Sequence, residues 1–119
     1  MDELREVTIT PDRYTTYHYA GASGDFNPIH LDDEFAQSVE LPSKILHGLW
    51  TMAQIARVHG EAAGDPLALK SLSVQFRGLG VPEKEITITS KPRGDGEFDT
   101  EAVQDGNKLV RRGKAVLRI

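Results

Sequence analysis

The stretch "ILHGLWTMAQIARVHGEAAG", residues 45–64, decides the fold. It predicts a helix over about 45–63, and apolar side chains fall on nearly every face of that helix instead of on one stripe. The polar exceptions His47, Thr51 and Gln54 are spaced i, i+4 and i+7, so they line one edge. A helix of this composition is expected to be enclosed by other parts of the chain.

Beyond this helix, the apolar pattern changes from helical to alternating. Four alternating stretches follow, over 71–77, 86–89, 98–102 and 109–119. The segments "RGDG" (93–96) and "DGN" (105–107) predict hairpin turns, because glycine and asparagine tolerate positive φ. A weaker strand is expected at "EVTIT" (6–10). One antiparallel sheet wrapped around one enclosed helix buries both, so we predict a single α+β domain over residues 1–119.

Two shorter helices are expected before the long one. Thr10-Pro11-Asp12 has the composition of a helix start and predicts a helix over about 11–20. Asp32 is placed to cap a second helix over Asp33–Val39. On these helices and the long one we expect Tyr14 and Tyr17 to make core contacts, and His18 and His59 to be partly exposed.

The composition is typical of a small water-soluble domain. Of the 119 residues, 39% are hydrophobic and 27% charged, and the formal net charge is -4. This acidic balance argues against a nucleic-acid partner, and no apolar run approaches the roughly 18 residues of a membrane span. The absence of cysteine excludes disulfides and thiolate chemistry. The start "MDELREVTIT" lacks the features of a signal peptide, so we expect a cytoplasmic protein.

A second stretch, "YAGASGDFNPIHLDD" (19–33), concentrates residues able to carry chemistry. Two interpretations of it are open. In the first, Asp25 and Asn27 only shape a turn before a proline, and His30 is exposed ahead of a helix. In the second, Asp25 and His30 are a carboxylate and an imidazole brought together for proton transfer.

Gly48 favours the second interpretation. It lies at the start of the enclosed helix, where unpaired N–H groups and the helix dipole attract negative charge. A glycine there lets a ligand oxygen approach the backbone closely, as in an oxyanion hole, although helix packing alone can also require a small residue. A carboxylate, an imidazole and such a donor are the groups needed to add water across a polarised double bond.

Other sites are less well supported by the sequence. Zinc binding by His30, Asp32 and His47 lacks any recognised ligand spacing, so no metal is expected. "GASGD" is not a nucleotide-binding loop, and Ser23 is not part of a G-x-S-x-G motif.

The two motifs "YAGASGDFNPIHLDDEFAQ" (19–37) and "ILHGLWTMAQIA" (45–56) together resemble the MaoC-like, (R)-specific enoyl-CoA hydratase family. The shared pattern is Y-A-x-x-S-G-D-x-N-P-x-H, followed after a gap by H-G at the start of the central helix. "LSVQFRGLGVP" (72–82) resembles a later strand of the family. The resemblance implies a hotdog fold, in which a sheet wraps around a long helix, and dimers with acyl-CoA bound at the subunit interface.

The resemblance also implies roles for individual residues. The implied set is a catalytic pair (Asp25 and His30), an oxyanion hole (Gly48), two site-shaping residues (Asn27 and His47) and two weaker substrate contacts (Thr51 and Gln54). Several family members carry a serine where this chain has Ala56; either Thr51 or Gln54 takes its place, or the site differs in substrate or rate. Lys44, Arg77 and Arg93 are candidates for contacting a CoA phosphate.

The function implied is reversible hydration of a trans-2-enoyl-CoA or enoyl-acyl carrier protein to the (R)-3-hydroxyacyl thioester. No cofactor is expected, because hydration leaves the oxidation state unchanged. A homodimer or higher homo-oligomer is expected, and a heterodimer is also compatible. Two alternatives are a hotdog acyl-CoA thioesterase and a non-catalytic acyl-thioester-binding or partner subunit of a heterodimeric dehydratase.

Overall fold

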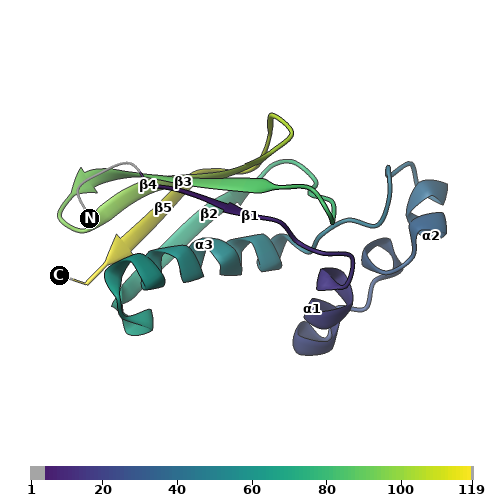
Figure 1. Ribbon diagram of the computed structural model, residues 1–119, viewed down its shortest axis with the longest axis horizontal. Helices are drawn as coiled ribbons and strands as arrows, with labels where there is room; N and C mark the ends of the chain where they lie inside the picture. Colours follow the sequence, from purple (N-terminus) through teal and green to yellow (C-terminus); the bar gives the residue numbers. More distant parts are fainter. Residues whose placement is uncertain (1–4, 119) are drawn as a thin grey trace.

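The computed structural model describes residues 5–118, with a sheet that covers one long helix (Figure 1). The elements, in chain order, are β1 (Arg5–Ile9), α1 (Thr15–Ser23), the 3₁₀ turn η1 (Pro28–His30), α2 (Asp33–Ser38), α3 (Gly48–Ala63), the 3₁₀ turn η2 (Pro66–Ala68), β2 (Leu69–Phe76), β3 (Ile86–Gly94), β4 (Glu97–Gln104) and β5 (Asn107–Leu117). No helix among these described residues is long and apolar enough to cross a membrane.

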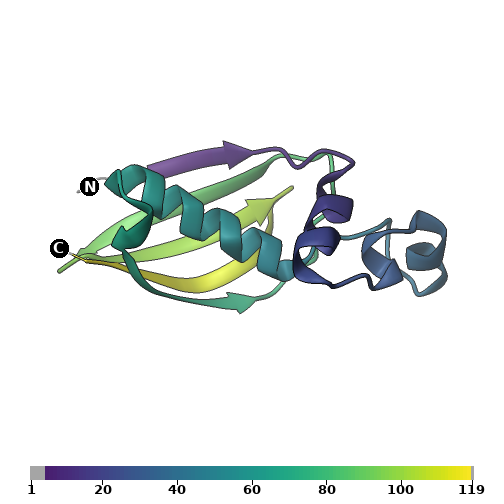
Figure 2. The ribbon, with the colours of Figure 1, turned by 90° about the horizontal axis from the view of Figure 1, so that it is seen from below.

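The five strands form one antiparallel sheet in the order β1-β3-β4-β5-β2, and α3 runs across one of its faces (Figure 2). Both predicted hairpin turns are confirmed. The β3–β4 turn is made by Asp95 and Gly96, and the β4–β5 turn by Asp105 and Gly106. All four residues have positive φ, between 50° and 77°, which is the requirement of a tight two-residue hairpin.

The core lies between α3 and the sheet, as predicted. Ile55 and Val58 of α3 pack with the buried side chains of Ile86, Ile88 and Val110. Burial of side chains of this size contributes about 1.5–3 kcal/mol each relative to exposure. This packing fixes the orientation of α3 beneath the sheet and therefore the place where the helix begins.

The prediction that α3 is enclosed on nearly every face is wrong for this chain by itself. The side of the helix that faces away from the sheet is open, with Leu49 60% exposed and Ala53 and Arg57 also exposed. The helix also begins at Gly48 and not near Ile45, because His47 has an extended backbone (ψ 133°) and the Ile45 carbonyl accepts from Nδ1 of His30 and not from a helix N–H. Apolar composition therefore overstated how much of α3 the sheet covers.

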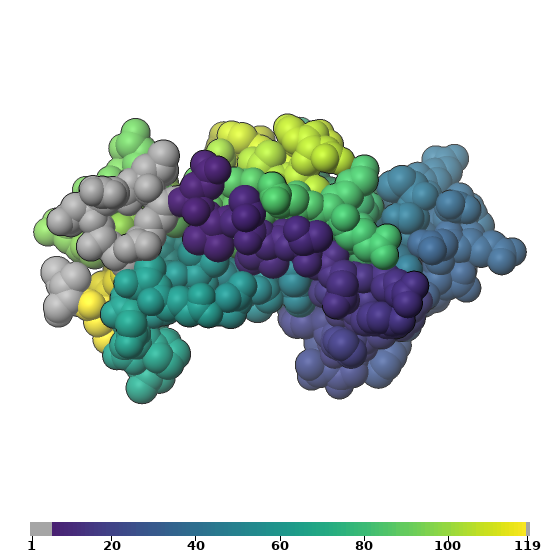
Figure 3. Space-filling model, viewed as in Figure 1, coloured from purple at the N-terminus to yellow at the C-terminus, as the bar shows by residue number. Residues whose placement is uncertain are grey.

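Helices α1 and α2 lie beyond one end of the sheet, and α2 forms the right-hand end of the molecule (Figure 3). α2 and its cap Asp32 are confirmed, since that carboxylate accepts the N–H groups of Glu34 and Phe35. α1 begins at Thr15, later than predicted, because the Asp12 carboxylate accepts the N–H of Tyr14 (2.8 Å) and so holds a turn before the helix.

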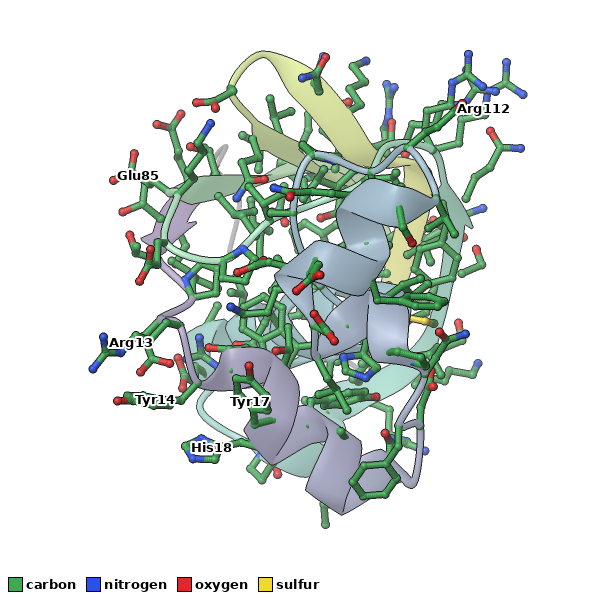
Figure 4. The ribbon with its side chains drawn as sticks, turned by 90° about the vertical axis from the view of Figure 1, so that its right-hand side faces the viewer. Arg13, Tyr14, Tyr17, His18, Glu85 and Arg112 are labelled. Atoms are coloured by element: carbon green, nitrogen blue, oxygen red, sulfur yellow. The ribbon has the colours of Figure 1, made fainter. Side chains whose placement is uncertain are left out.

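Three expectations about aromatic and histidine side chains are wrong. Tyr14 and Tyr17 are 50% and 45% exposed, and they lie with Arg13 and His18 on the outer surface of α1 and of the turn that precedes it (Figure 4). His59 is fully buried, where its Nδ1–H donates to the Ile55 carbonyl (2.8 Å) and its Nε2 accepts from the hydroxyl of Ser90 (2.7 Å). The prediction that His59 is partly exposed is wrong because the apolar pattern of α3 does not show which side of the helix faces the sheet.

Candidate active site

Asp25 and His30 lie together at the end of the molecule where α3 begins. Oδ2 of Asp25 is 3.8 Å from Nε2 of His30. The Asp25 side chain is 54% exposed, whereas that of His30 is only 10% exposed. The pair therefore joins a solvent-accessible carboxylate to a buried imidazole.

Local turn chemistry sets the direction of the Asp25 carboxylate. The Asp25 N–H donates to Oγ of Ser23 (3.2 Å), and Oδ1 of Asp25 accepts the N–H of Asn27 (3.2 Å). Asn27 in turn accepts the N–H of Ile29 and begins the 3₁₀ turn that carries His30. Oδ1 is thus occupied in the turn, and Oδ2 faces His30. The turn interpretation and the chemical interpretation of this stretch are therefore compatible.

The hydrogen bond of His30 to the backbone defines its tautomer. Nδ1 lies 2.8 Å from the carbonyl oxygen of Ile45, and a carbonyl can only accept. Nδ1 therefore carries the hydrogen, and in the neutral ring the lone pair of Nε2 points toward Asp25. This is the arrangement that a ring nitrogen needs in order to accept a proton and later return it.

His47 is buried directly against His30. The two rings are nearly parallel, with centroids 3.8 Å apart and an interplanar angle of 19°. Nε2 of His47 lies 3.0 Å from the backbone carbonyl of Asp25, so this nitrogen carries the hydrogen. His47 therefore contacts both members of the predicted pair, and its shaping role stays a prediction.

A metal-like grouping is also present, formed by Asp25, His30 and His47, whose ligand atoms lie within 4.8 Å of one another. It differs from the zinc alternative considered from the sequence, because Asp32 caps α2 instead. The lone pairs of an imidazole lie in its ring plane, and two nearly parallel stacked rings do not direct theirs to one point. The arrangement therefore suits proton transfer better than joint metal ligation.

Gly48 begins α3 beside a small pocket. In the part of the chain that the structure describes, the Gly48 N–H donates no hydrogen bond. The pocket, of about 220 Å³, is lined by His30, Ile45, Leu46, Gly48, Thr51, Phe76, Arg77, Gly78, Leu79, Gly80 and Leu109. A buried imidazole and a helix N-terminus therefore face one cavity with mostly apolar walls.

The structure does not bring every predicted residue to this pocket. His30, Gly48 and Thr51 line it, whereas Asp25, Asn27, His47 and Gln54 do not. Ala56, at the position where several family members carry serine, lines a separate groove beside η2. Of the two predicted substitutes for that serine, only Thr51 stands beside His30 and Gly48.

Apart from Arg77, the residues at the end of β2 and just after it (76–80) were not predicted to belong to the site. The Phe76 ring lies 3.2 Å from the position a Cβ at Gly48 would take. Gly78 and Gly80 bring this segment close to its neighbours, since a Cβ at Gly78 would lie 2.7 Å from the carbonyl oxygen of Lys108. Two glycines in "FRGLG" (76–80) were the available signal, because they permit close backbone approach.

The candidate phosphate contacts differ in availability. The side chain of Lys44 forms an ion pair with Asp33 at 3.6 Å. The backbone N–H of Lys44 also donates to the Asp33 carboxylate, and this hydrogen bond is the main reason that the pKa of Asp33 is lowered. Arg93 pairs with Asp99. Among the described residues, Arg77 has no carboxylate within ion-pair distance, and it lines the pocket. Arg77 is therefore the best placed of the three.

The arrangement of one long helix against a five-stranded antiparallel sheet is the predicted hotdog fold, and solved structures confirm it. The "MaoC-like dehydratase from Phytophthora Capsici" superposes with a TM-score of 0.89 at 29% identity, covering 96% of this chain and 40% of that one. The "(R)-hydratase from A. caviae involved in PHA biosynthesis" superposes with a TM-score of 0.86 at 21% identity, covering 99% and 95%.

The family follows from the sequence match. The profile of the "MaoC like domain" matches residues 1–113, and the chain belongs to this family, as the two motifs predicted. "Enoyl-CoA hydratase 2, peroxisomal" from Arabidopsis thaliana is 35% identical over 98 residues, which cover 81% of this chain and 32% of that protein. The chain thus spans about a third or less of the length of the curated relatives that it matches.

Proposed function

We propose that this domain catalyses the reversible hydration of a trans-2-enoyl thioester to the (R)-3-hydroxyacyl thioester. The observation that carries the proposal is the pairing of Asp25 Oδ2 with His30 Nε2, together with the pocket that His30 shares with Gly48 at the start of α3. Membership of the MaoC-like family and the similarity to an enoyl-CoA hydratase support it.

In the proposed reaction, a water molecule binds between Asp25 and His30. At 3.8 Å the two side-chain atoms are too far apart for a direct hydrogen bond, but one water fits at about 2.8 Å from each. The pair takes up one proton from this water as its oxygen bonds to C3 and passes one proton to C2, so Asp25 and His30 together finish with the number of protons with which they began. The C2–C3 double bond becomes single, so the oxidation state is unchanged and no redox cofactor takes part. Addition is syn when the water and the proton both come from this one pair, which is the stereochemistry that we propose.

The N–H of Gly48 stabilises the charge that develops on the substrate. As water adds to C3, electrons move onto the thioester oxygen and form an enolate. A donor at a helix N-terminus favours that negative charge, and one such donor contributes roughly 3 kcal/mol of transition-state stabilisation. Glycine at this position leaves room for the thioester beside the Phe76 ring.

We propose further that the active form is a dimer, or a heterodimer with a related chain, in which a second subunit covers this end of the molecule. Three large apolar side chains near the pocket are open to solvent in the single chain: Leu49 at 60%, Phe76 at 49% and Leu79 at 58% exposure. Light scattering on the purified protein tests this assembly.

A series of enoyl thioesters of increasing chain length, offered on CoA and on acyl carrier protein, tests the reaction. Hydration should remove the absorbance of the conjugated double bond, and chiral analysis should give the (R)-3-hydroxy product. Release of free thiol without hydration would instead assign the thioesterase alternative. No reaction with any member of the series would contradict both.

A further inference from the structure

His47 occupies the capping position of α3 but does not cap it. The side chain is buried, at 3% exposure, and makes no hydrogen bond to the N–H groups of the first helical turn. Serine, threonine, aspartate and asparagine are the residues that serve a helix N-terminus best. A histidine in this place therefore leaves the helix N–H groups available and directs its own hydrogen-bonding group elsewhere.

Its hydrogen bond goes to the backbone of Asp25. The His47 Nε2–H donates to the Asp25 carbonyl over 3.0 Å, across 22 positions of sequence. The other hydrogen bonds described for Asp25 involve Ser23 and Asn27, in the same exposed loop. His47 is thus the contact that attaches the Asp25 loop to the start of α3.

The ring of His47 also fixes the ring of His30. The two rings stack at 3.8 Å, and the Tyr19 ring packs on His47 at 4.9 Å with a 59° tilt. The hydrogen bond from Nδ1 to the Ile45 carbonyl holds one edge of the His30 ring, and the His47 ring packs against one of its faces. Together these contacts allow His30 little freedom to turn away from Asp25.

We propose that His47 is a positioning residue, which holds Asp25 and His30 in fixed relation to the N–H of the adjacent Gly48. The inference rests on the proposed hydration, since it assigns a role within that site. Displacement of a reacting group by about 1 Å is enough to reduce a rate by up to roughly 100-fold. Loss of the His47 contacts should therefore lower kcat and leave the KM of the thioester nearly unchanged.

Two substitutions separate the hydrogen bond from the packing. His47→Phe keeps a stacking ring and removes the donor, and it should lower kcat by about 10- to 100-fold with KM within about twofold of the native value. His47→Gln keeps an N–H donor and removes the stacking ring, so it should also lower kcat with KM nearly unchanged. His18→Phe, on the exposed surface of α1, is the matched control and should change neither constant. Native kcat in both His47 variants, or a KM that rises as much as kcat falls, would overturn the proposal.

Imidazole ¹⁵N spectra of the unmodified protein provide a second test that needs no folded variant and no activity. The proposal requires the hydrogen of His47 on Nε2 and that of neutral His30 on Nδ1. A His47 hydrogen on Nδ1 would overturn the proposal, whatever the variants do. If the protein hydrates no enoyl thioester but shows these tautomers, the proposed reaction fails while the contact of His47 with Asp25 stands.

Discussion

Nε2 of His30 and Oδ2 of Asp25 face each other across 3.8 Å, although one side chain is buried and the other is open to solvent. The two atoms are held there by different parts of the chain. Asp25 is directed by the turn that it forms with Asn27, and His30 by its hydrogen bond to the backbone of Ile45. The gap between them is suited to one bridging water, on which the proposed reaction depends.

Substitution of Gly48 by alanine should lower activity. The added Cβ would lie 3.2 Å from the Phe76 ring, in the space that the proposed thioester oxygen needs to reach the helix N–H. Because loss of a single oxyanion donor costs about 100- to 1,000-fold in kcat, we expect partial obstruction to cost at least roughly tenfold. Steady-state hydration of crotonyl-CoA measures the effect.

Gly21 provides the matched control for Gly48→Ala. It lies within α1, and a Cβ there would have no atom within 4 Å. Gly21→Ala should leave kcat unchanged and stabilise the protein by about 0.5–1 kcal/mol, because alanine favours the helix. Equal activities of Gly48→Ala and Gly21→Ala would argue against Gly48 as the oxyanion donor.

Arg77 should contribute to binding the carrier and not to the chemistry. Its side chain lines the pocket and has no carboxylate partner among the described residues. Arg77→Ala is expected to raise the KM for crotonyl-CoA several-fold, since guanidinium groups bind phosphate well. The N-acetylcysteamine thioester of crotonate carries no phosphate, so its KM should not change. Equal effects on both substrates would place the role of Arg77 elsewhere.

His59 should make the stability of the fold sensitive to pH. Burial lowers the pKa of this histidine, whose Nε2 accepts from Ser90. The unfolded chain binds a proton at His59 below about pH 6.5, whereas the folded chain resists it. Stability is therefore fully present above this pH. It decreases as pH falls toward the lowered folded pKa, by up to about 1.4 kcal/mol per pH unit.

Urea unfolding between about pH 8 and pH 5.5 measures this dependence. His59→Gln removes the titrating group and should flatten the decrease, whereas His18→Gln, at an exposed position, should leave the decrease as it is. The same slope in His59→Gln and the native protein would show that the decrease comes from other groups.

The parts of the fold and site that the sequence predicted correctly depend on local chemistry. The hairpin turns at 95–96 and 105–106 follow from residues that tolerate positive φ, and the cap at Asp32 follows from a short side chain placed before a helix. The Asp25 loop is similar, because each of its side-chain bonds spans only two residues. Such features depend on neighbouring residues alone, so they can be predicted without the rest of the chain.

The parts that were missed depend on contacts between distant segments. The burial of His59 arises from Ser90 in β3, and the Phe76 wall of the pocket arises from β2 reaching the start of α3. The open face of α3 has the same origin, since composition does not show which side of a helix the sheet covers. Helical periodicity therefore located α3 but did not determine its surroundings.

The most direct test of the proposed catalytic pair is the rate of crotonyl-CoA hydration by Asp25→Asn and His30→Ala. Asp95→Asn, in the β3–β4 turn, and His18→Ala are the matched controls, because they remove the same chemical groups at exposed positions away from the pair. We expect kcat/KM to fall by at least about 100-fold in each site variant, as is usual when an essential acid or base is removed, and to stay near native in the controls. Site variants within twofold of the native protein would contradict the assignment of Asp25 and His30 as the groups that activate water.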